Sequence, residues 1–108
     1  MVEPTVITFG EPVEHDTDVR DRECVVEGVR WAFVEYAPGS GRAGWCTQPH
    51  MGYVISGELE YRFEDGRPAL QLAGGDAFAL PSQPGHAGRN RSSEPARIFI
   101  IDALASGE

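Results

Sequence analysis

The sequence predicts a small all-β domain, a sandwich or barrel of short antiparallel strands. Its 13 Gly and 8 Pro are spread between short apolar segments, a spacing typical of many strands joined by turns. Apolar residues at helical spacing are hard to find along the chain. A length of 108 residues suits one domain and leaves no room for a second folded unit. We therefore expect a single domain of about nine short strands.

The first 24 residues are expected to form an N-terminal arm ahead of a barrel that runs from about residue 25 to residue 102. Residues 5–9 (TVITF) are apolar and β-branched, which predicts a strand. Residues 11–23 carry six acidic side chains and two Arg with little apolar content, which favours a solvated loop or a sheet edge. His15 lies in this segment and is expected to be solvated.

The first half of the predicted barrel contains the more apolar strands. Residues 25–36 are β-branched and aromatic at both parities, as in a strand covered on two sides. Glycine and proline at 38–41 predict a turn. Further strands are expected at 42–47 and 50–56.

Residues 58–64 (ELEYRFE) alternate strictly between apolar and charged residues. This period of two predicts a half-buried strand that leaves Glu58 and Glu60 in solvent. The following Asp65-Gly66 pair is typical of a hairpin turn. The remaining predicted strands are at 69–72, 77–80, 86–90 and 96–102.

The charge of the chain excludes several functions. Its 17 acidic residues outnumber nine basic ones, all of which are Arg, and the formal net charge is −8. Nucleic acid is therefore an unfavourable partner, because phosphate binding depends on clustered basic residues. The absence of Lys also excludes a Schiff-base lysine, a Walker-type phosphate lysine and a polybasic membrane anchor.

The sequence is interpreted as that of a soluble, cytoplasmic protein with no membrane partner. No segment approaches the roughly 18 consecutive apolar residues that a membrane helix needs. The N-terminus has neither a basic start nor an apolar core typical of a signal peptide. Cys24 and Cys46 allow at most one disulfide, and both are expected to be free thiols.

Two glycine-bounded blocks, at 44–57 and 75–90, carry the candidate functional residues. In the second block, Gly75, Pro81, His86 and Asn90 are spaced as G-x5-P-x4-H-x3-N. This spacing resembles the second motif of the cupin superfamily, G-x5-P-x-G-x2-H-x3-N, and the resemblance covers about residues 30–102. Gln83 departs from the motif, because a glycine is usual there. The resemblance implies a double-stranded β-helix, or jelly-roll barrel, in a small single-domain cupin.

The first cupin motif is altered in this chain. The run from Tyr53 to Glu58 (YVISGE) is similar to the usual end of that motif, in which Gly57 is the anchor. Counting back from Gly57, His50 stands in the place of the metal-binding glutamate, Cys46 in that of the second histidine and Gly44 in that of the first. The family's three-histidine, one-glutamate metal set is thus reduced to Cys46, His50 and His86.

The residue types support a metal site at these three positions. Thiolate and imidazole are natural ligands of zinc, and three protein ligands leave a fourth position for water or substrate. We expect zinc first, with iron, nickel, copper and manganese as alternatives. The simpler reading is that Cys46 only packs and the two histidines satisfy other partners. Asn90 is expected to bond the backbone at a strand end.

The leading functional hypothesis is a metal-binding cupin that acts on, or senses, a small organic molecule inside the barrel. If it is an enzyme, a metal-dependent lyase, isomerase, hydrolase or dioxygenase-like activity is expected. The alternatives are a metal-free ligand-binding module, or a regulatory partner of another enzyme. The resemblance also implies a homodimer, since small cupins often pair by sheet extension.

Overall fold

The computed structural model describes residues 4–103, which form nine β-strands and no helix. No helix in this part of the chain is therefore long and apolar enough to cross a membrane. The strands are β1 (Val13–His15), β2 (Val19–Val26), β3 (Val29–Tyr36), β4 (His50–Ser56), β5 (Glu58–Phe63), β6 (Leu70–Ala73), β7 (Ala77–Leu80), β8 (His86–Arg89) and β9 (Ala96–Ala103). The predicted all-β class is confirmed.

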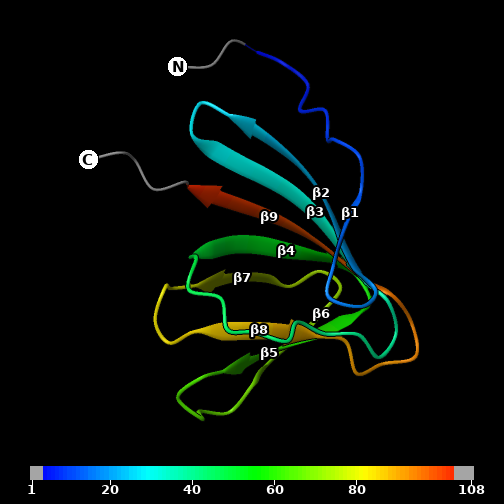
Figure 1. The fold of residues 1–108 in the computed structure, drawn as a ribbon, viewed down its shortest axis with the longest axis vertical. Helices are drawn as coiled ribbons and strands as arrows, with labels where there is room; N and C mark the ends of the chain where they lie inside the picture. Colours follow the sequence, from blue (N-terminus) through cyan, green and yellow to red (C-terminus); the bar gives the residue numbers. More distant parts are fainter. Residues whose placement is uncertain (1–3, 104–108) are drawn as a thin grey trace.

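The strands form two antiparallel sheets arranged as a jelly roll (Figure 1). The larger sheet has the order β1-β2-β3-β9-β4-β7, and the smaller has the order β6-β5-β8. Strands that are distant in sequence become neighbours, since β9 pairs with β3 on one side and with β4 on the other. Figure 1 shows β9, in red, between the cyan β2–β3 hairpin and the green β4.

The apolar core lies between the two sheets. Strand β3 places Ala32, Val34 and Tyr36 in the core, and β9 places Ile98 and Ile100 there, each at alternate positions. The smaller sheet contributes buried residues from β5 and β6: Leu59, Tyr61 and Leu72. Burial of each large apolar side chain stabilises the fold by about 1.5–3 kcal/mol. Asp102 follows Ile98 and Ile100 at the same parity, so β9 also carries one carboxylate inward.

The outer face of the larger sheet is apolar along β4. Met51, Tyr53 and Ile55 are exposed there and alternate with inward residues of the same strand. Their cross-strand neighbours on β9 are Ile101 and Phe99. Strand β4 therefore has apolar side chains on both faces. Val54 lies in the core, and Met51, Tyr53 and Ile55 lie at the surface.

Most strands of the predicted barrel are confirmed, but residues 25–36 form two strands rather than one. The chain reverses between β2 and β3 at Glu27 and Gly28, which have φ angles of 50° and 77°. Two successive positive φ angles are the geometry of a tight hairpin turn that matches the twist of its strands. Valines at Val25, Val26 and Val29 conceal this turn in the sequence.

The expectations for the first 24 residues were partly wrong. Residues 5–9 form no strand. Contacts of this region with the sheet include the bonds from the Gly10 amide to the Glu23 carbonyl and from Arg22 Nε to the Gly10 carbonyl, both 3.0 Å, and the edge contact of Phe9 with Phe99. The segment 11–23 instead contains β1 and much of β2. Strand β2 alternates buried and exposed residues at its start, but one buried residue is Asp21. Because the inward residue Asp21 is charged, residues 11–23 lack the apolar alternation that would have indicated a strand.

The strand expected at 42–47 was also wrong. The chain there touches β8 only at two isolated bridges, Gly41 with Arg89 and Cys46 with His86. The two bridges are five residues apart on this segment but only three apart on β8. The residues between Gly41 and Cys46 therefore bulge out of the ladder. The second of these bridges positions the candidate site.

Candidate metal centre

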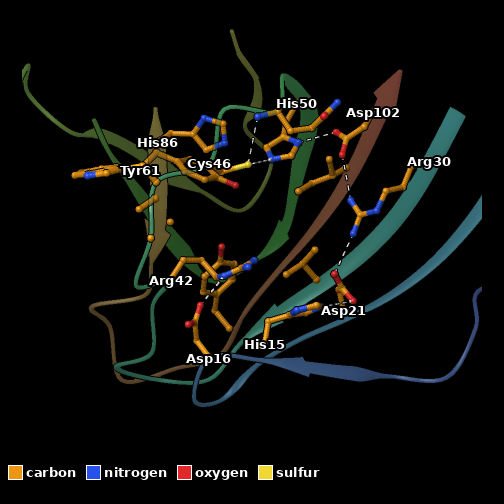
Figure 2. A pocket seen from close by; sticks show the side chains of 18 residues that line it. His15, Asp16, Asp21, Arg30, Arg42, Cys46, His50, Tyr61, His86 and Asp102 are labelled. Carbon is orange, nitrogen blue, oxygen red and sulfur yellow. Dashed lines mark hydrogen bonds and ion pairs between the residues drawn. The ribbon is translucent and has the colours of Figure 1, made fainter. Parts of the chain in front are cut away.

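The structure brings the three predicted ligand residues together at one end of the barrel interior (Figure 2). Cys46 and His86 face each other across their bridge, with hydrogen bonds from the Cys46 amide to the His86 carbonyl (2.8 Å) and from the His86 amide to the Cys46 carbonyl (3.0 Å). Directly opposed residues of an antiparallel pair project to the same side. His50, the first residue of β4, completes the cluster, and the potential ligand atoms all lie within 4.8 Å of one another.

His86 is the most constrained member of the cluster. It is 2% exposed, and neither of its ring nitrogens has a hydrogen-bond partner. Its ring meets His50 and Tyr61 edge to face, with centroid separations of 4.9 and 5.7 Å. A buried imidazole without a partner is costly, because its polar nitrogens have lost their water. A metal ion in the cluster would satisfy one of them.

His50 is oriented by a carboxylate that the sequence analysis missed. Its Nδ1 lies 2.6 Å from Oδ1 of Asp102, which is 1% exposed. With one ring proton on Nδ1 donated to Asp102, Nε2 of His50 is the nitrogen that faces the Cys46 sulfur, at 3.8 Å. A carboxylate behind a histidine is the usual support of a metal-binding imidazole. The available signal was parity, since Asp102 continues the inward face of the apolar strand β9.

The electrostatics of the cluster favour a thiolate. Hydrogen bonding with His50, and then the nearby His86 ring, lower the pKa of Cys46 to about 5 against the opposing effect of burial, and the Gln48 amide also donates to the sulfur at 3.4 Å. Burial alone would lower the pKa of His50, but its bonds to Asp102 and Cys46 outweigh it and raise that pKa to about 9. The thiolate is the form of cysteine that binds metals and attacks electrophiles.

A chain of ion pairs leads from the cluster to the edge of the larger sheet. Arg30 donates from Nη1 to Asp102 (3.1 Å), from Nη2 to Asp21 (3.0 Å) and from Nε to Glu23. Asp21 in turn meets Nε2 of His15 at 3.0 Å. His15 was expected to be solvated, but it is half-buried and lines the cavity beside the cluster. Asp21 is therefore buried because its carboxylate binds both Arg30 and His15 on the inner side of β2.

A cavity of about 560 Å³ opens beside the cluster and is large enough for a small organic molecule. Its charged lining comes from Asp16, Asp21, Asp102, Arg30 and Arg42. Gly44 also lines it, and nothing lies within 4 Å of the position that a Cβ would take there. The place where the first histidine of the motif would stand is thus open space beside the three candidate ligands.

Two other sequence-based expectations have clear outcomes. Asn90 bonds the backbone as expected, donating to the carbonyls of Tyr36 (3.2 Å) and Glu94 (2.7 Å). Glu60 was expected in solvent but is 4% exposed, because Gln71 (2.7 Å) and Arg89 cover its carboxylate. Hydrogen bonding from Gln71 lowers the pKa of Glu60, with Arg89 acting in the same direction against burial. Glu60 does not line the cavity and takes no part in the site.

A comparison of the sequence with known protein families agrees with the jelly-roll fold and with the motif residues described above. The family profile described as Cupin domain matches residues 32–102. The protein is a cupin. The match includes Cys46, His50 and His86, so the candidate site lies within the family region of this cupin.

Solved structures show the same fold at low sequence identity. Oxalate decarboxylase from Bacillus subtilis superposes with a TM-score of 0.74 and 21% identity over 89% of this cupin and 28% of that chain. The polyketide cyclase RemF from Streptomyces resistomycificus gives 0.76 and 13% over 100% of this cupin and 83% of that chain. A sugar phosphate isomerase from Silicibacter pomeroyi gives 0.70 and 16% over 92% and 72%.

These neighbours have different activities, so the likeness shows the fold alone. One structure of the decarboxylase concerns its Mn(II) centres, which belong to that enzyme. The cupin described here spans 28% of the decarboxylase chain. A comparison with curated protein sequences gives no match. The chemistry of this cupin must therefore be argued from its own residues.

Proposed function

We propose that this cupin binds a divalent transition metal through Cys46, His50 and His86, and acts on or senses a small organic molecule in the adjoining cavity. The observation that carries the proposal is His86, a buried ring whose two nitrogens have no hydrogen-bond partner and one of whose nitrogens lies within 4.8 Å of the potential ligand atoms of Cys46 and His50. Zinc is the proposed metal, because one thiolate and two neutral imidazoles suit its borderline-soft character. Iron, nickel, copper and manganese are the alternatives.

The residues around the cluster have distinct tasks in this proposal. Asp102 accepts the Nδ1 proton of His50 and so keeps Nε2 available as a ligand. Gly44 leaves space at the cavity side for water or substrate. A bound divalent ion would supply Lewis-acid charge, and with one thiolate the centre would carry net +1. The reducing cytoplasm, which we propose as its location, would keep the Cys46 thiol reduced.

The same geometry also fits a metal-free nucleophilic thiol. In that case His50 would take the proton of Cys46, and Asp102 would hold His50, an arrangement used for covalent catalysis by cysteine. A nucleophilic thiol, however, would not explain why His86 is buried beside the sulfur without a partner. The metal centre accounts for all three side chains and is therefore preferred.

A metal-free ligand-binding module is the second candidate function. It is favoured by two observations, the open space at Gly44 and the donor set that is reduced compared with the cupin motif. In this case the cavity would hold an organic ligand by polar contacts alone.

Elemental analysis of untagged protein, purified without added metal or chelator, tests the proposal. We expect about one transition-metal ion per chain, lost in His86→Ala and in Cys46→Ala. The matched controls are His15→Ala and Cys24→Ala, which change the third histidine and the other cysteine outside the cluster and should keep the metal. Absence of metal after reconstitution under reducing conditions would contradict the proposal. Native mass spectrometry showing an organic ligand without metal would favour the binding module.

A further inference from the structure

Two arginines line the cavity, and their guanidinium groups are engaged very differently. Arg30 uses all three of its nitrogens, on Glu23, Asp21 and Asp102. Arg42 uses Nε, which donates to Oδ2 of Asp16 at 2.8 Å. Within residues 4–103, no carboxylate accepts a hydrogen bond from the terminal nitrogens of Arg42. Arg30 is thus a structural cation, whereas Arg42 retains donor capacity for a ligand in the cavity.

A buried tyrosine adds a second donor beside Arg42. Tyr36 is 3% exposed and lines the cavity, with its hydroxyl close to the backbone of Gly88, where a Cβ would lie 2.6 Å away. Burial raises the pKa of Tyr36 to about 12, although the charge of the neighbouring Arg42 and its side-chain contact with the hydroxyl act in the opposite direction. The hydroxyl therefore stays protonated at neutral pH and can donate a hydrogen bond together with the guanidinium.

The present partner of Arg42 is a carboxylate on a turn. Asp16 lies between β1 and β2 with a φ of 51°, and its Oδ2 also accepts a long bond from the Ala43 amide at 3.4 Å. Figure 2 shows Arg42 and Asp16 together on the side of the cavity opposite Cys46 and His50. The Asp16 carboxylate thus occupies Nε of Arg42. The cavity separates this ion pair from the Cys46–His50–His86 cluster.

We infer that the cavity recognises a small organic acid, whose carboxylate binds the terminal nitrogens of Arg42 in competition with Asp16. This inference rests on the proposed function only in that the rest of the acid would face the Cys46–His50–His86 cluster. The planar guanidinium fork matches a carboxylate in two parallel hydrogen bonds. The cavity also contains three aspartates against two arginines, so a carboxylate group, which brings one negative charge to Arg42, suits it better than a phosphate group, which brings up to two to the same point.

Two substitutions that break the same ion pair should have opposite effects on binding. Arg42→Gln removes the recognising guanidinium, and we expect it to weaken malonate binding by about tenfold or more. Asp16→Asn removes the competing carboxylate, and we expect it to strengthen malonate binding several-fold. Because both variants lose the anchor of the β1–β2 turn, a purely structural effect would have the same sign in both. Arg67→Gln, which removes an exposed arginine paired with Asp65 away from the cavity, is the control and should leave binding unchanged.

Calorimetric titration with malonate, its neutral diamide and inorganic phosphate measures these effects. The inference is supported if malonate binds the parent and the Asp16→Asn protein, and the diamide and phosphate bind more weakly. It is overturned if malonate binds neither protein, if phosphate binds more tightly, or if Arg42→Gln binds malonate as well as the parent does.

Metal content, measured on the same samples, separates this inference from the metal proposal. Arg42→Gln protein that keeps its metal but loses malonate binding would support both. Protein that holds no metal yet binds malonate through Arg42 would support the organic-acid site and contradict the metal centre.

Discussion

Replacement of Asp102 by asparagine tests the polar support of the site with little change in volume. Asp102 is 1% exposed and binds Nδ1 of His50 at 2.6 Å and Nη1 of Arg30 at 3.1 Å. An asparagine side chain has one oxygen acceptor, so Asp102→Asn can keep one of these bonds and turns an NH₂ group toward the other donor. If the oxygen stays on Arg30, the amide donates to Nδ1 of His50 and moves the ring proton to Nε2, toward Cys46.

The expected cost is the loss of about one charge-assisted hydrogen bond, or about 1.5–3 kcal/mol of unfolding free energy. Urea unfolding of the metal-free protein measures it, with an unchanged slope expected if only stability changes. In the loaded protein, metal affinity should fall by about 10- to 100-fold, because the histidine tautomer is no longer held. Asp65→Asn is the matched control. It breaks the exposed pair with Arg67 and should leave the unfolding free energy nearly unchanged, because water screens such a pair. Equal stability of the parent and Asp102→Asn, or an equal loss in Asp65→Asn, would refute the reasoning.

Three further predictions concern the thiol, the core and the outer face. In metal-free Cys24→Ala protein, alkylation of Cys46 by iodoacetamide should be half-maximal near pH 5, since its pKa is lowered to about 5, and a midpoint near that of an ordinary thiol would contradict the site geometry. Gly52→Ala should lose about 1–3 kcal/mol in urea unfolding, because its Cβ would lie 2.4 Å from Phe78 Cζ, whereas Gly44→Ala, in open space, should change stability by less than about 0.5 kcal/mol. We propose that a second copy covers the exposed face of β4, so light scattering should give about twice 11.8 kDa, and a monomer mass would exclude this pairing.

The parts of the fold that could be predicted are those whose signal is local. Residues 58–63 alternate strictly because one face of β5 packs in the core, and the turn at Asp65-Gly66 follows from residue type. The ligand candidates could be named because cysteine and histidine stand at motif spacings.

The polar support of the site could not be predicted in this way. The bond from His50 to Asp102 spans 52 residues, and that from Arg30 to Asp102 spans 72. Such contacts depend on β9 inserting between β3 and β4, which no short pattern encodes. Asp21 made the problem harder, because its charge concealed the inward face of β2. The errors at Asp21 and Asp102 therefore occur where ion pairs replace apolar burial.

The backbone bridge between Cys46 and His86 bears on how this barrel could acquire new chemistry. Its two hydrogen bonds join main-chain atoms, so the scaffold presents both side chains regardless of what they are. A donor exchange such as Cys46→His would change the charge and softness of the centre while keeping both main-chain bonds of the bridge. An evolving lineage, or a protein engineer, can thus vary reactivity at these two positions one substitution at a time while the architecture persists.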